Sequence, residues 1–252
     1  LYELYDPKYG RRTYVNYPDI SKNVINATVA AEDHTFWTNG GVDLQGIARA
    51  ALADLQSHTA VEGGSTITQQ LVKAQFFSGQ SRTLQVKGQE VILAYGLTQQ
   101  YPKWKIMEMY LNTIYYGDLN YGIEAAAQAF FNIQPKCTKT SCIPAAAQLD
   151  LAQASLLAGL PQLPTYYNPI ANKPAALTRQ KLILQSMIDL GMITQKDASQ
   201  AEAEMAKYTF HEYDHGIQAP HFVHYVIDQV LVPLLGAQNL LDGGYNIYTT
   251  LD

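Results

Sequence analysis

The sequence predicts a mainly α-helical protein with short flanking β-strands. Apolar residues recur at intervals near 3.6 along ten segments, which is the spacing of one face of a helix. Prolines and paired glycines, as at 40–41 and 63–64, separate these segments. Alternation typical of strands occurs at residues 14–17 and 245–248, and these two ends can pair.

Five helices are predicted in the first half of the chain, at residues 23–35, 44–57, 66–77, 85–100 and 103–114. Glycines before the third helix free the backbone for a tight turn, and Ser65 and Thr66 offer hydroxyls that can cap its first turn. The second helix carries an apolar stripe from Leu44 to Leu55. This stripe fits either packing against the core or an interfacial helix that dips toward a membrane.

Five further helices are predicted at residues 122–131, 150–159, 174–190, 195–206 and 220–235. The two cysteines of the chain, Cys137 and Cys142, flank a polar tip in the loop after the first of these. In an exported protein this spacing favours a local disulfide, and a pair of free thiols is the alternative. A metal site would need further ligands nearby, and the sequence offers none.

Composition limits the class of protein. The 252 residues can form one large or two small domains with a sizeable core. Charged residues make up only 15%, and the net charge of −5 argues against nucleic-acid binding. The 18 tyrosines suit a surface that meets membrane or sugar, or a tyrosine-rich soluble protein. No apolar run reaches the length of a membrane span, and no signal peptide is visible.

The segment Gly63-Gly64-Ser65-Thr66-Ile67-Thr68-Gln69-Gln70 is the most informative in the chain. It combines a glycine turn, hydroxyl caps and the start of a helix. Such a turn presents backbone N–H groups and the positive end of a helix dipole, which favour an anion such as phosphate. The sequence therefore predicts a phosphate cradle here.

Carboxylates flank this cradle in sequence. Glu32 and Asp33 follow a run of small apolar residues, and burial against such neighbours raises a carboxyl pKa and makes a better base. Glu90 lies three residues after Lys87 on one predicted helix face. The simpler interpretations are a solvated helix end for the first pair and a surface ion pair, worth less than about 1 kcal/mol, for the second.

Five ordered segments resemble the motifs of the bacterial peptidoglycan glycosyltransferases of family 51, the polymerase domains of class A (bifunctional) penicillin-binding proteins and the monofunctional transglycosylases. They lie at Glu32–Asp43, Gly63–Gln70, Val86–Glu90, Ile106–Asn112 and Leu156–Gln162, the last continuing with Tyr167-Asn168-Pro169 and Arg179. The second matches the family pattern G-G-S-T-I-T-Q-Q at every position. The resemblance implies a lysozyme-like glycosyltransferase fold and an inverting hexosyl transfer. In that reaction lipid II is polymerised into β-1,4-linked glycan strands, and polyprenyl pyrophosphate is released.

The resemblance also implies roles for the carboxylates. Glu32 would be the general base that deprotonates the 4-hydroxyl of the acceptor sugar. Asp33 would orient Glu32 or position a cation. Glu90 would serve the pyrophosphate side, either with a divalent cation, Mg²⁺ or Mn²⁺, or by orienting Lys87 and Arg82. No organic cofactor is implied.

Basic and polar residues would hold the donor pyrophosphate and the growing glycan chain. The implied set is Ser65, Thr66, Gln69, Gln70, Lys73, Arg82, Lys87, Phe36 and Asn112. The inhibitor moenomycin, a phosphoglycolipid, would bind the same cleft. Lys103 and Lys105 are expected to lie on a solvated helix face.

Four positions depart from the family pattern. Asn39 replaces a histidine, Ala74 an asparagine, Val86 a basic residue and Thr98 a glutamate. Val86 removes one cation from the presumed phosphate site. The departures leave open a weaker donor site or one that depends more on a metal ion.

The resemblance further predicts the organisation of the chain. Residues 1–20 would be a strand and linker after a membrane anchor, and 21–235 the glycosyltransferase domain. Residues 44–62 would form a membrane-proximal subdomain, and 236–252 would begin the linker to a transpeptidase domain. The protein would act at the extracytoplasmic face of the bacterial cytoplasmic membrane, on its outer leaflet, beside other cell-wall synthesis proteins.

Two other functions fit parts of the sequence. A lysozyme-like lytic, glycan-cleaving enzyme needs only one glutamate, but it has no pyrophosphate to bind. A catalytically weak domain that binds lipid II or glycan is suggested by Asn39 and Val86. Loss of Glu32 or Glu90 would favour the latter, and both residues are present.

Overall fold

The computed structural model describes residues 10–43, 64–81, 83–138, 140–211, 219–236, 239–240, 245 and 247–249. The chain divides into two units. The larger unit comprises Arg12–Glu212, and the smaller comprises Leu1–Arg11 with Tyr213–Asp252. The predicted membrane-proximal subdomain at 44–62 and its helix at 44–57 lie outside the described residues.

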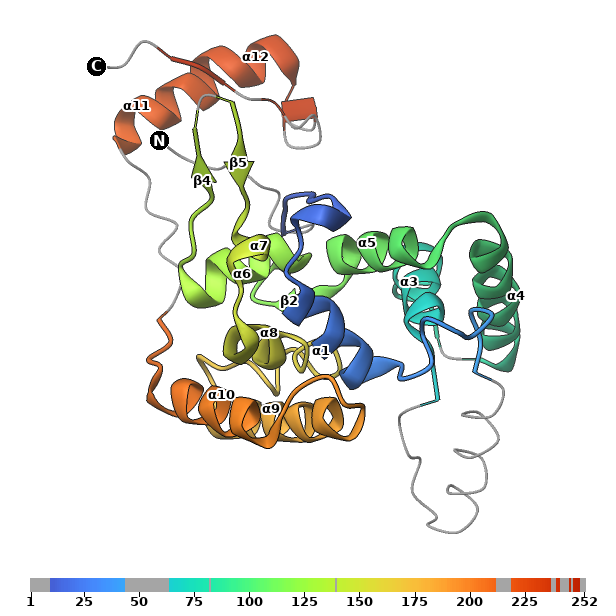
Figure 1. The fold of residues 1–252 in the computed structure, drawn as a ribbon. Helices are drawn as coiled ribbons and strands as arrows, with labels where there is room; N and C mark the ends of the chain where they lie inside the picture. Colours follow the sequence, from blue (N-terminus) through green and yellow to red (C-terminus); the bar gives the residue numbers. More distant parts are fainter. Residues whose placement is uncertain are drawn as a thin grey trace. The chain divides into compact units, whose positions relative to one another are not determined.

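Helices build the larger unit (Figure 1). They are α1 (Lys22–Glu32), α3 (Ile67–Phe76), α4 (Leu84–Gln100), α5 (Lys103–Thr113), α6 (Ile123–Phe131), α7 (Ala145–Gln148), α8 (Leu151–Leu157), α9 (Lys173–Asp189) and α10 (Gln195–Lys207). Each predicted helix among the described residues of this unit is present, with ends within three residues of the prediction. The short α7 was not predicted. The mainly α fold class is confirmed.

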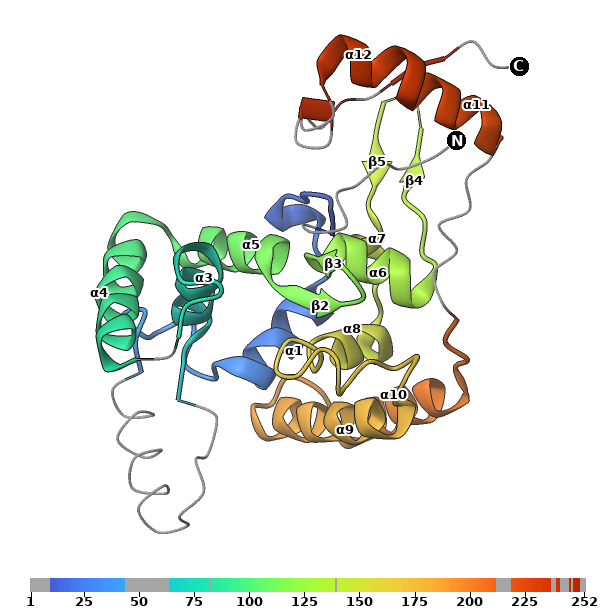
Figure 2. The ribbon, with the colours of Figure 1, turned by 180° about the vertical axis from the view of Figure 1, so that it is seen from behind.

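Two groups of helices surround α1 and α3. Helix α1 packs on α8 and α9, and α10 packs on the same pair, while α3 lies between α4 and α5 (Figures 1 and 2). The main core fills the space among these helices and includes fully buried Phe36, Ile67, Tyr110 and Leu157. A smaller apolar cluster of Val72, Phe77 and Ala94 joins α3 to α4. This arrangement brings the end of α1 and the start of α3 next to Tyr110 of α5.

Helix α1 is fixed at its start by a cap and along its length by small apolar residues. The Ser21 hydroxyl accepts from the Asn23 N–H at 3.3 Å and donates to the Leu149 carbonyl at 2.7 Å. Ala27, Val29 and Ala30 are at most 3% exposed. Their small size allows close approach to α8 and α9, so the far end of α1 is held rigidly.

Short strands occur, but not where the alternation predicts them. Antiparallel strands β2 (Tyr115–Gly117) and β3 (Asn120–Tyr121) form a sheet of order β1–β3–β2 with β1 (Arg11–Arg12). Strands β4 (Lys136–Cys137) and β5 (Cys142–Ile143) form a second hairpin. In this hairpin Cys137 and Cys142 are directly opposite each other and joined by a disulfide.

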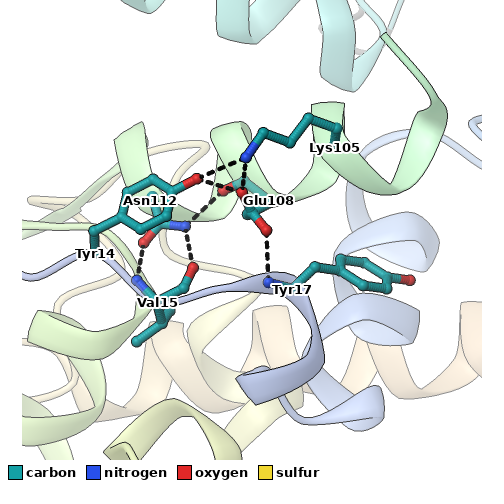
Figure 3. A network of polar contacts seen from close by, with 6 residues as sticks. All are labelled: Tyr14, Val15, Tyr17, Lys105, Glu108 and Asn112. Carbon is teal, nitrogen blue, oxygen red and sulfur yellow. Dashed lines mark hydrogen bonds and ion pairs between the residues drawn. The ribbon is translucent and has the colours of Figure 1, made fainter.

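The predicted strand at 14–17 is wrong, because side chains of α5 satisfy this backbone instead of another strand (Figure 3). Asn112 accepts from the Val15 N–H and donates to the Val15 carbonyl, both at 2.8 Å. Glu108 accepts from the Tyr17 N–H at 2.7 Å, and also from the Tyr14 hydroxyl and the Lys105 ammonium. A 3₁₀ turn at Tyr17–Asp19 follows.

The smaller unit contains α11 (Pro220–Tyr225), a π-helical stretch η2 (Val226–Leu231) and α12 (Val232–Leu235). These cover the predicted helix at 220–235 as one run. Residues 245 and 247–249 lie outside helices and strands. Over the part of the chain that the structure describes, no helix has the length and apolar character needed to span a membrane.

Candidate active site at the start of α3

The first turn of α3 is closed by its own side chains. Thr66 and Gln69 form a reciprocal capping box, with the Thr66 hydroxyl accepting from the Gln69 N–H at 3.1 Å. The Gln69 amide oxygen accepts from the Thr66 N–H at 3.0 Å. The Thr66 hydroxyl also donates to the Gly41 carbonyl at 2.6 Å. This turn is therefore rigid before any ligand arrives.

Asp33 ties the end of α1 to the start of α3. Its Oδ2 accepts from the Ile67 N–H at 3.2 Å, and its Oδ1 accepts from the Thr35 N–H and hydroxyl at 3.2 and 3.1 Å. The Asn39 amide nitrogen lies 3.0 Å from each oxygen. Burial raises the pKa of Asp33, although these hydrogen bonds and Lys103 oppose the shift. With both oxygens occupied by donors, Asp33 acts as a clamp between elements.

Asn39, which stands where the family pattern has a histidine, makes several hydrogen bonds with its amide group. Besides Asp33, its amide oxygen accepts from the Gly41 N–H at 2.9 Å and from the Lys103 ammonium at 2.8 Å. Lys103 also lies 4.7 Å from the centroid of the Phe36 ring, in cation–π geometry. Burial lowers the pKa of Lys103, opposed by the Asp33 charge.

Glu32 ends α1 as a half-buried carboxylate with two different oxygens. Oε2 accepts from the Gln70 amide nitrogen at 2.6 Å. Oε1 is buried and has no hydrogen-bond partner. Burial raises the pKa of Glu32, while Gln70 and the Arg179 guanidinium favour the charged form and oppose that shift. A carboxylate with a raised pKa and one unused oxygen is suited to accept a proton.

Arg179 reaches Glu32 from α9 because a glycine makes room for it. A Cβ at Gly159 would lie 2.8 Å from Cγ of Arg179, so any larger residue there would displace the side chain. The guanidinium lies 3.5 Å from the Ala31 carbonyl, and its Nε is buried without a partner. Within the fifth sequence motif, Gly159 thus leaves the space and Arg179, on α9, supplies the charge.

Glu90 and Lys87 form the second charged pair, on α4. Glu90 is 4% exposed, and its Oε1 lies 2.5 Å from the Lys87 ammonium. The same ammonium donates to the Ser65 hydroxyl at 2.9 Å. The simple interpretation as a surface ion pair is wrong for Glu90, because its carboxylate is buried. Lys87 instead connects α4 to the residue just before the α3 cap.

Both carboxylates therefore lie against the same turn. Glu32 is bonded to Gln70, and Glu90 is linked through Lys87 to Ser65. Ser65 lies just before the α3 cap, and Gln70 lies in the first turns of the helix. The start of α3 is therefore contacted by a carboxylate, Glu32, and by an ammonium, Lys87.

The other predicted binding residues that the structure describes are either exposed or buried. Lys73 is exposed on α3, one turn after Gln70, and Arg82 lies outside the described residues. Thr66, Gln69, Phe36 and Asn112 are at most 3% exposed. Their side chains cap α3, pack the core or hold the Val15 backbone. In the structure these four side chains contact the protein itself, and their role in substrate binding stays a prediction.

The two lysines expected on a solvated helix face differ. Lys103 does not lie on a solvated face, because it bonds to Asn39 and contacts the Phe36 ring. Lys105 is partly exposed on α5, where it pairs with Glu108 three residues later. The motif spacing held no signal for the Lys103 contacts, because their partners come from a distant segment. Tyr110, whose hydroxyl donates to the Gln70 amide oxygen at 3.1 Å, was missed for the same reason.

Val86 also has a packing role that explains its departure. Its half-buried side chain packs on the cluster of Val72, Phe77 and Ala94 between α3 and α4. Another departure, Thr98, donates to the Ala94 carbonyl at 3.0 Å. Val86 therefore helps hold α4, which carries Lys87 and Glu90, against α3, whereas the Thr98 bond lies within α4.

The predicted divalent cation finds few free ligands. Among the described residues, no three His, Cys, Asp or Glu side chains are grouped to hold a metal. Asp33 has donors on both oxygens, and Glu90 has the Lys87 ammonium against it. A cation at Glu90 would have to compete with that ammonium. The donor set that the described residues offer here does not fit a metal site.

Comparisons with known proteins all point to the same family. A family model described as Transglycosylase matches residues 2–188. Penicillin-binding protein 1A of Aquifex aeolicus is 40% identical over 225 residues, covering 84% of this chain and 29% of that protein. Penicillin-binding protein 1A of Neisseria meningitidis serogroup A is 37% identical over 243 residues, covering 96% of this chain and 28% of that protein. The chain thus spans less than a third of these relatives.

A solved structure supports the fold. The crystal structure of penicillin-binding protein 1A from Haemophilus influenzae is similar with a TM-score of 0.50 at 21% identity. The similarity covers 92% of this chain and 22% of that one.

Proposed function

This chain belongs to the transglycosylase family, and from that premise we propose that it is a peptidoglycan glycosyltransferase. It joins lipid II units into β-1,4-linked glycan strands and releases polyprenyl pyrophosphate. The observation that carries the proposal is the α3 turn, which has Glu32 with an unpaired oxygen at one side and Lys87 at the other. A hydrolase would have no use for the cationic side.

Glu32 is the general base in this proposal. Its carboxylate takes the proton from the 4-hydroxyl of the acceptor sugar as the oxygen of that hydroxyl attacks the anomeric carbon of the donor. The bond from the anomeric carbon to the pyrophosphate oxygen breaks, and the electron pair leaves with the pyrophosphate. Attack from the face opposite the leaving group inverts the configuration. The raised pKa of Glu32 makes proton transfer easier than for an ordinary carboxylate.

Lys87 and Lys73 neutralise the departing pyrophosphate, with Arg82 assigned to the same task. Lys87 is held by Glu90 and Ser65, so its ammonium is fixed before the substrate binds. Glu90 acts in this proposal by orienting Lys87. We derive no step through Mg²⁺ or Mn²⁺, because both oxygens of Asp33 accept from donors and Glu90 has the Lys87 ammonium against it. Fixed cations lower the cost of the growing negative charge.

The site of action follows from the substrate. A polyprenyl carrier stays in a bilayer, so we propose that the chain works at the outer leaflet of the bacterial cytoplasmic membrane. The proposal includes three earlier expectations: a membrane anchor, a transpeptidase domain and action beside other cell-wall synthesis proteins.

Incubation with labelled lipid II tests the activity. Glycosyl transfer gives long glycan chains that lysozyme digests, together with free polyprenyl pyrophosphate. The lytic alternative instead shortens isolated sacculi, and the binding alternative retains lipid II without turnover. Either of the last two results would contradict the proposal.

Moenomycin affinity tests the placement of the phosphate site. We expect Lys73→Ala, Arg82→Ala and Lys87→Ala each to weaken moenomycin binding and turnover by at least about tenfold, or roughly 1.4 kcal/mol. The matched control is Lys196→Ala, which removes an exposed lysine of α10. Unchanged affinity in all three site variants would show that the phosphate site lies elsewhere.

A further inference from the structure

Tyr110 contacts the proposed base through one intermediate residue. The tyrosine is 1% exposed on α5, and its hydroxyl donates to the Gln70 amide oxygen at 3.1 Å. The amide nitrogen of the same Gln70 donates to Oε2 of Glu32 at 2.6 Å. Three residues from α5, α3 and α1 thus form one chain of hydrogen bonds that ends on the base.

The chemistry of these groups fixes the direction of the chain. An ionised carboxylate only accepts hydrogen bonds, so the amide nitrogen of Gln70 must face Glu32. The amide oxygen then faces Tyr110 and needs a donor there, because a buried oxygen without one is costly. The phenol hydroxyl supplies that donor. Each bond polarises the next, so the hydroxyl strengthens the donation to Glu32.

We propose that Tyr110 is a positioning residue that holds the Gln70 amide with its nitrogen toward Glu32, leaving the other Glu32 oxygen free for the acceptor hydroxyl. The inference rests on the proposed function, since it assumes that Glu32 is the base. It extends that function, because it assigns the orientation of the base to a residue that does not itself face the substrate.

Other titratable groups lie near Glu32 and must be kept constant. Asp33 adjoins it in sequence, Arg179 approaches from α9, and buried Tyr116 approaches from β2. The neighbouring α8 carries no ionisable side chain. Of these groups, Arg179 favours the charged form and Asp33 disfavours it. Removing only the Tyr110 hydroxyl leaves all of them unchanged.

The test is the pH dependence of turnover in Tyr110→Phe, which keeps the ring and removes the hydroxyl. The ionised form of Glu32 loses the stabilisation that the Tyr110 hydroxyl gives it through Gln70. We therefore expect the acidic limb of the pH profile of kcat to move to higher pH by about half a unit to one unit. The KM for lipid II should change less than twofold. The matched control is Tyr116→Phe, which removes another buried phenol hydroxyl near Glu32, and its acidic limb should coincide with that of the wild type.

A double variant shows whether the effect passes through Gln70. In the Gln70→Leu background, adding Tyr110→Phe should produce no further shift, because the chain is already broken. Gln70→Leu alone should move the limb at least as far as Tyr110→Phe. This variant keeps the proposal testable if Tyr110→Phe does not fold. Additive shifts in the double variant would overturn it.

A measurement without turnover separates this inference from the proposed function. The pKa of Glu32 is followed by carbon NMR of labelled glutamate carboxyls, with Glu32→Gln used to assign the signal. A higher pKa in Tyr110→Phe supports the positioning role whether or not the kinetic limb follows. If the NMR shift occurs and the kinetic limb stays in place, Glu32 is not the base. An unchanged pKa in Tyr110→Phe would overturn the inference while leaving the proposed function intact.

Discussion

At the scale of single residues, Glu32 combines two features that stability alone would not favour. Its carboxyl is desolvated, and one of its oxygens lacks a hydrogen bond. Buried polar groups normally find partners, and an unsatisfied one reduces the free energy of unfolding. Strain of this kind is typical of groups kept ready for a substrate.

Glu32→Gln should therefore not destabilise the fold near neutral pH. The folded-state pKa is raised above the ordinary value of 4.5, so the ionised carboxylate opposes folding increasingly as pH rises through that window. Below the ordinary value the group is neutral in both states and the penalty vanishes. We expect Glu32→Gln to unfold at the same or a higher temperature than the wild type at pH 7.5, with the difference shrinking toward pH 4. Calorimetry across this range checks it, and a variant several degrees less stable at pH 7.5 would contradict the account.

The sequence identified the charged residues of the site more readily than their partners. Glu32, Glu90 and Lys87 lie in local motifs whose residue types indicate their chemistry. Tyr110 and Lys103 contact residues far away in sequence, Gln70 on α3 and Asn39 in the loop after α1, and no local pattern indicates such contacts. Residues of the same motifs can also be buried for structural reasons, as the capping role of Thr66 and Gln69 shows.

At the scale of elements, the site depends on how the loop after α1 meets α3 and α4. Gly41 has φ of +90° and lies against α4, and its carbonyl receives the Thr66 hydroxyl. A Cβ there would lie 2.4 Å from the Thr98 hydroxyl oxygen and 2.5 Å from the Ala94 carbonyl oxygen. Only glycine allows this approach.

Gly41→Ala should lower the free energy of unfolding by more than about 2 kcal/mol, because it adds both backbone strain and a clash. Turnover should fall as well, since the loop carries the hydrogen bonds to Asp33 and Thr66. The matched control is Gly40→Ala, whose Cβ would meet nothing within 4 Å and whose effect should stay within about 0.5 kcal/mol. Urea unfolding of both variants is the measurement. Equal stability of the two would show that the loop adapts freely.

Helix α5 joins the upstream segment to the same region. Its Asn112 and Glu108 hold the backbone of Val15 and Tyr17, while Tyr110, between them in sequence, faces Gln70 (Figure 3 shows the former contacts). Burial opposes ionisation of Glu108, but hydrogen bonds from Lys105 and Tyr14 lower its pKa overall. One helix thus serves the packing of the upstream segment on one face and the site on another.

Asn112→Ala should cost about 2–4 kcal/mol of unfolding free energy, because it leaves the Val15 N–H and carbonyl buried without partners. Hydrogen exchange at Val15 should speed up more than exchange in α9. Gln75→Ala, which removes an exposed side-chain hydrogen bond to Thr113, is the control and should cost no more than about 0.5 kcal/mol. Slow exchange at Val15 in Asn112→Ala would mean that another contact holds this segment.

At the scale of the whole molecule, the sequence predicted the helices well and the strands poorly. Periodicity over ten or more residues identifies a helix that buries one face, as for α5 and α9. Strands of two or three residues, such as β2 and β4, are too short to show alternation. Residues 14–17 alternate correctly but bond to side chains of α5, which is a tertiary effect. Alternation alone does not distinguish these cases.

The central claim is that Glu32 removes the proton from the acceptor sugar, and the initial rate of lipid II polymerisation by Glu32→Gln tests it most directly. Glutamine keeps the size and can still bond to Gln70, but it cannot accept the proton. The account predicts a loss of roughly 10²–10⁴-fold in kcat, or about 3–5 kcal/mol of barrier, with moenomycin affinity within about threefold of the wild type. Near-normal polymerisation by this variant would contradict it.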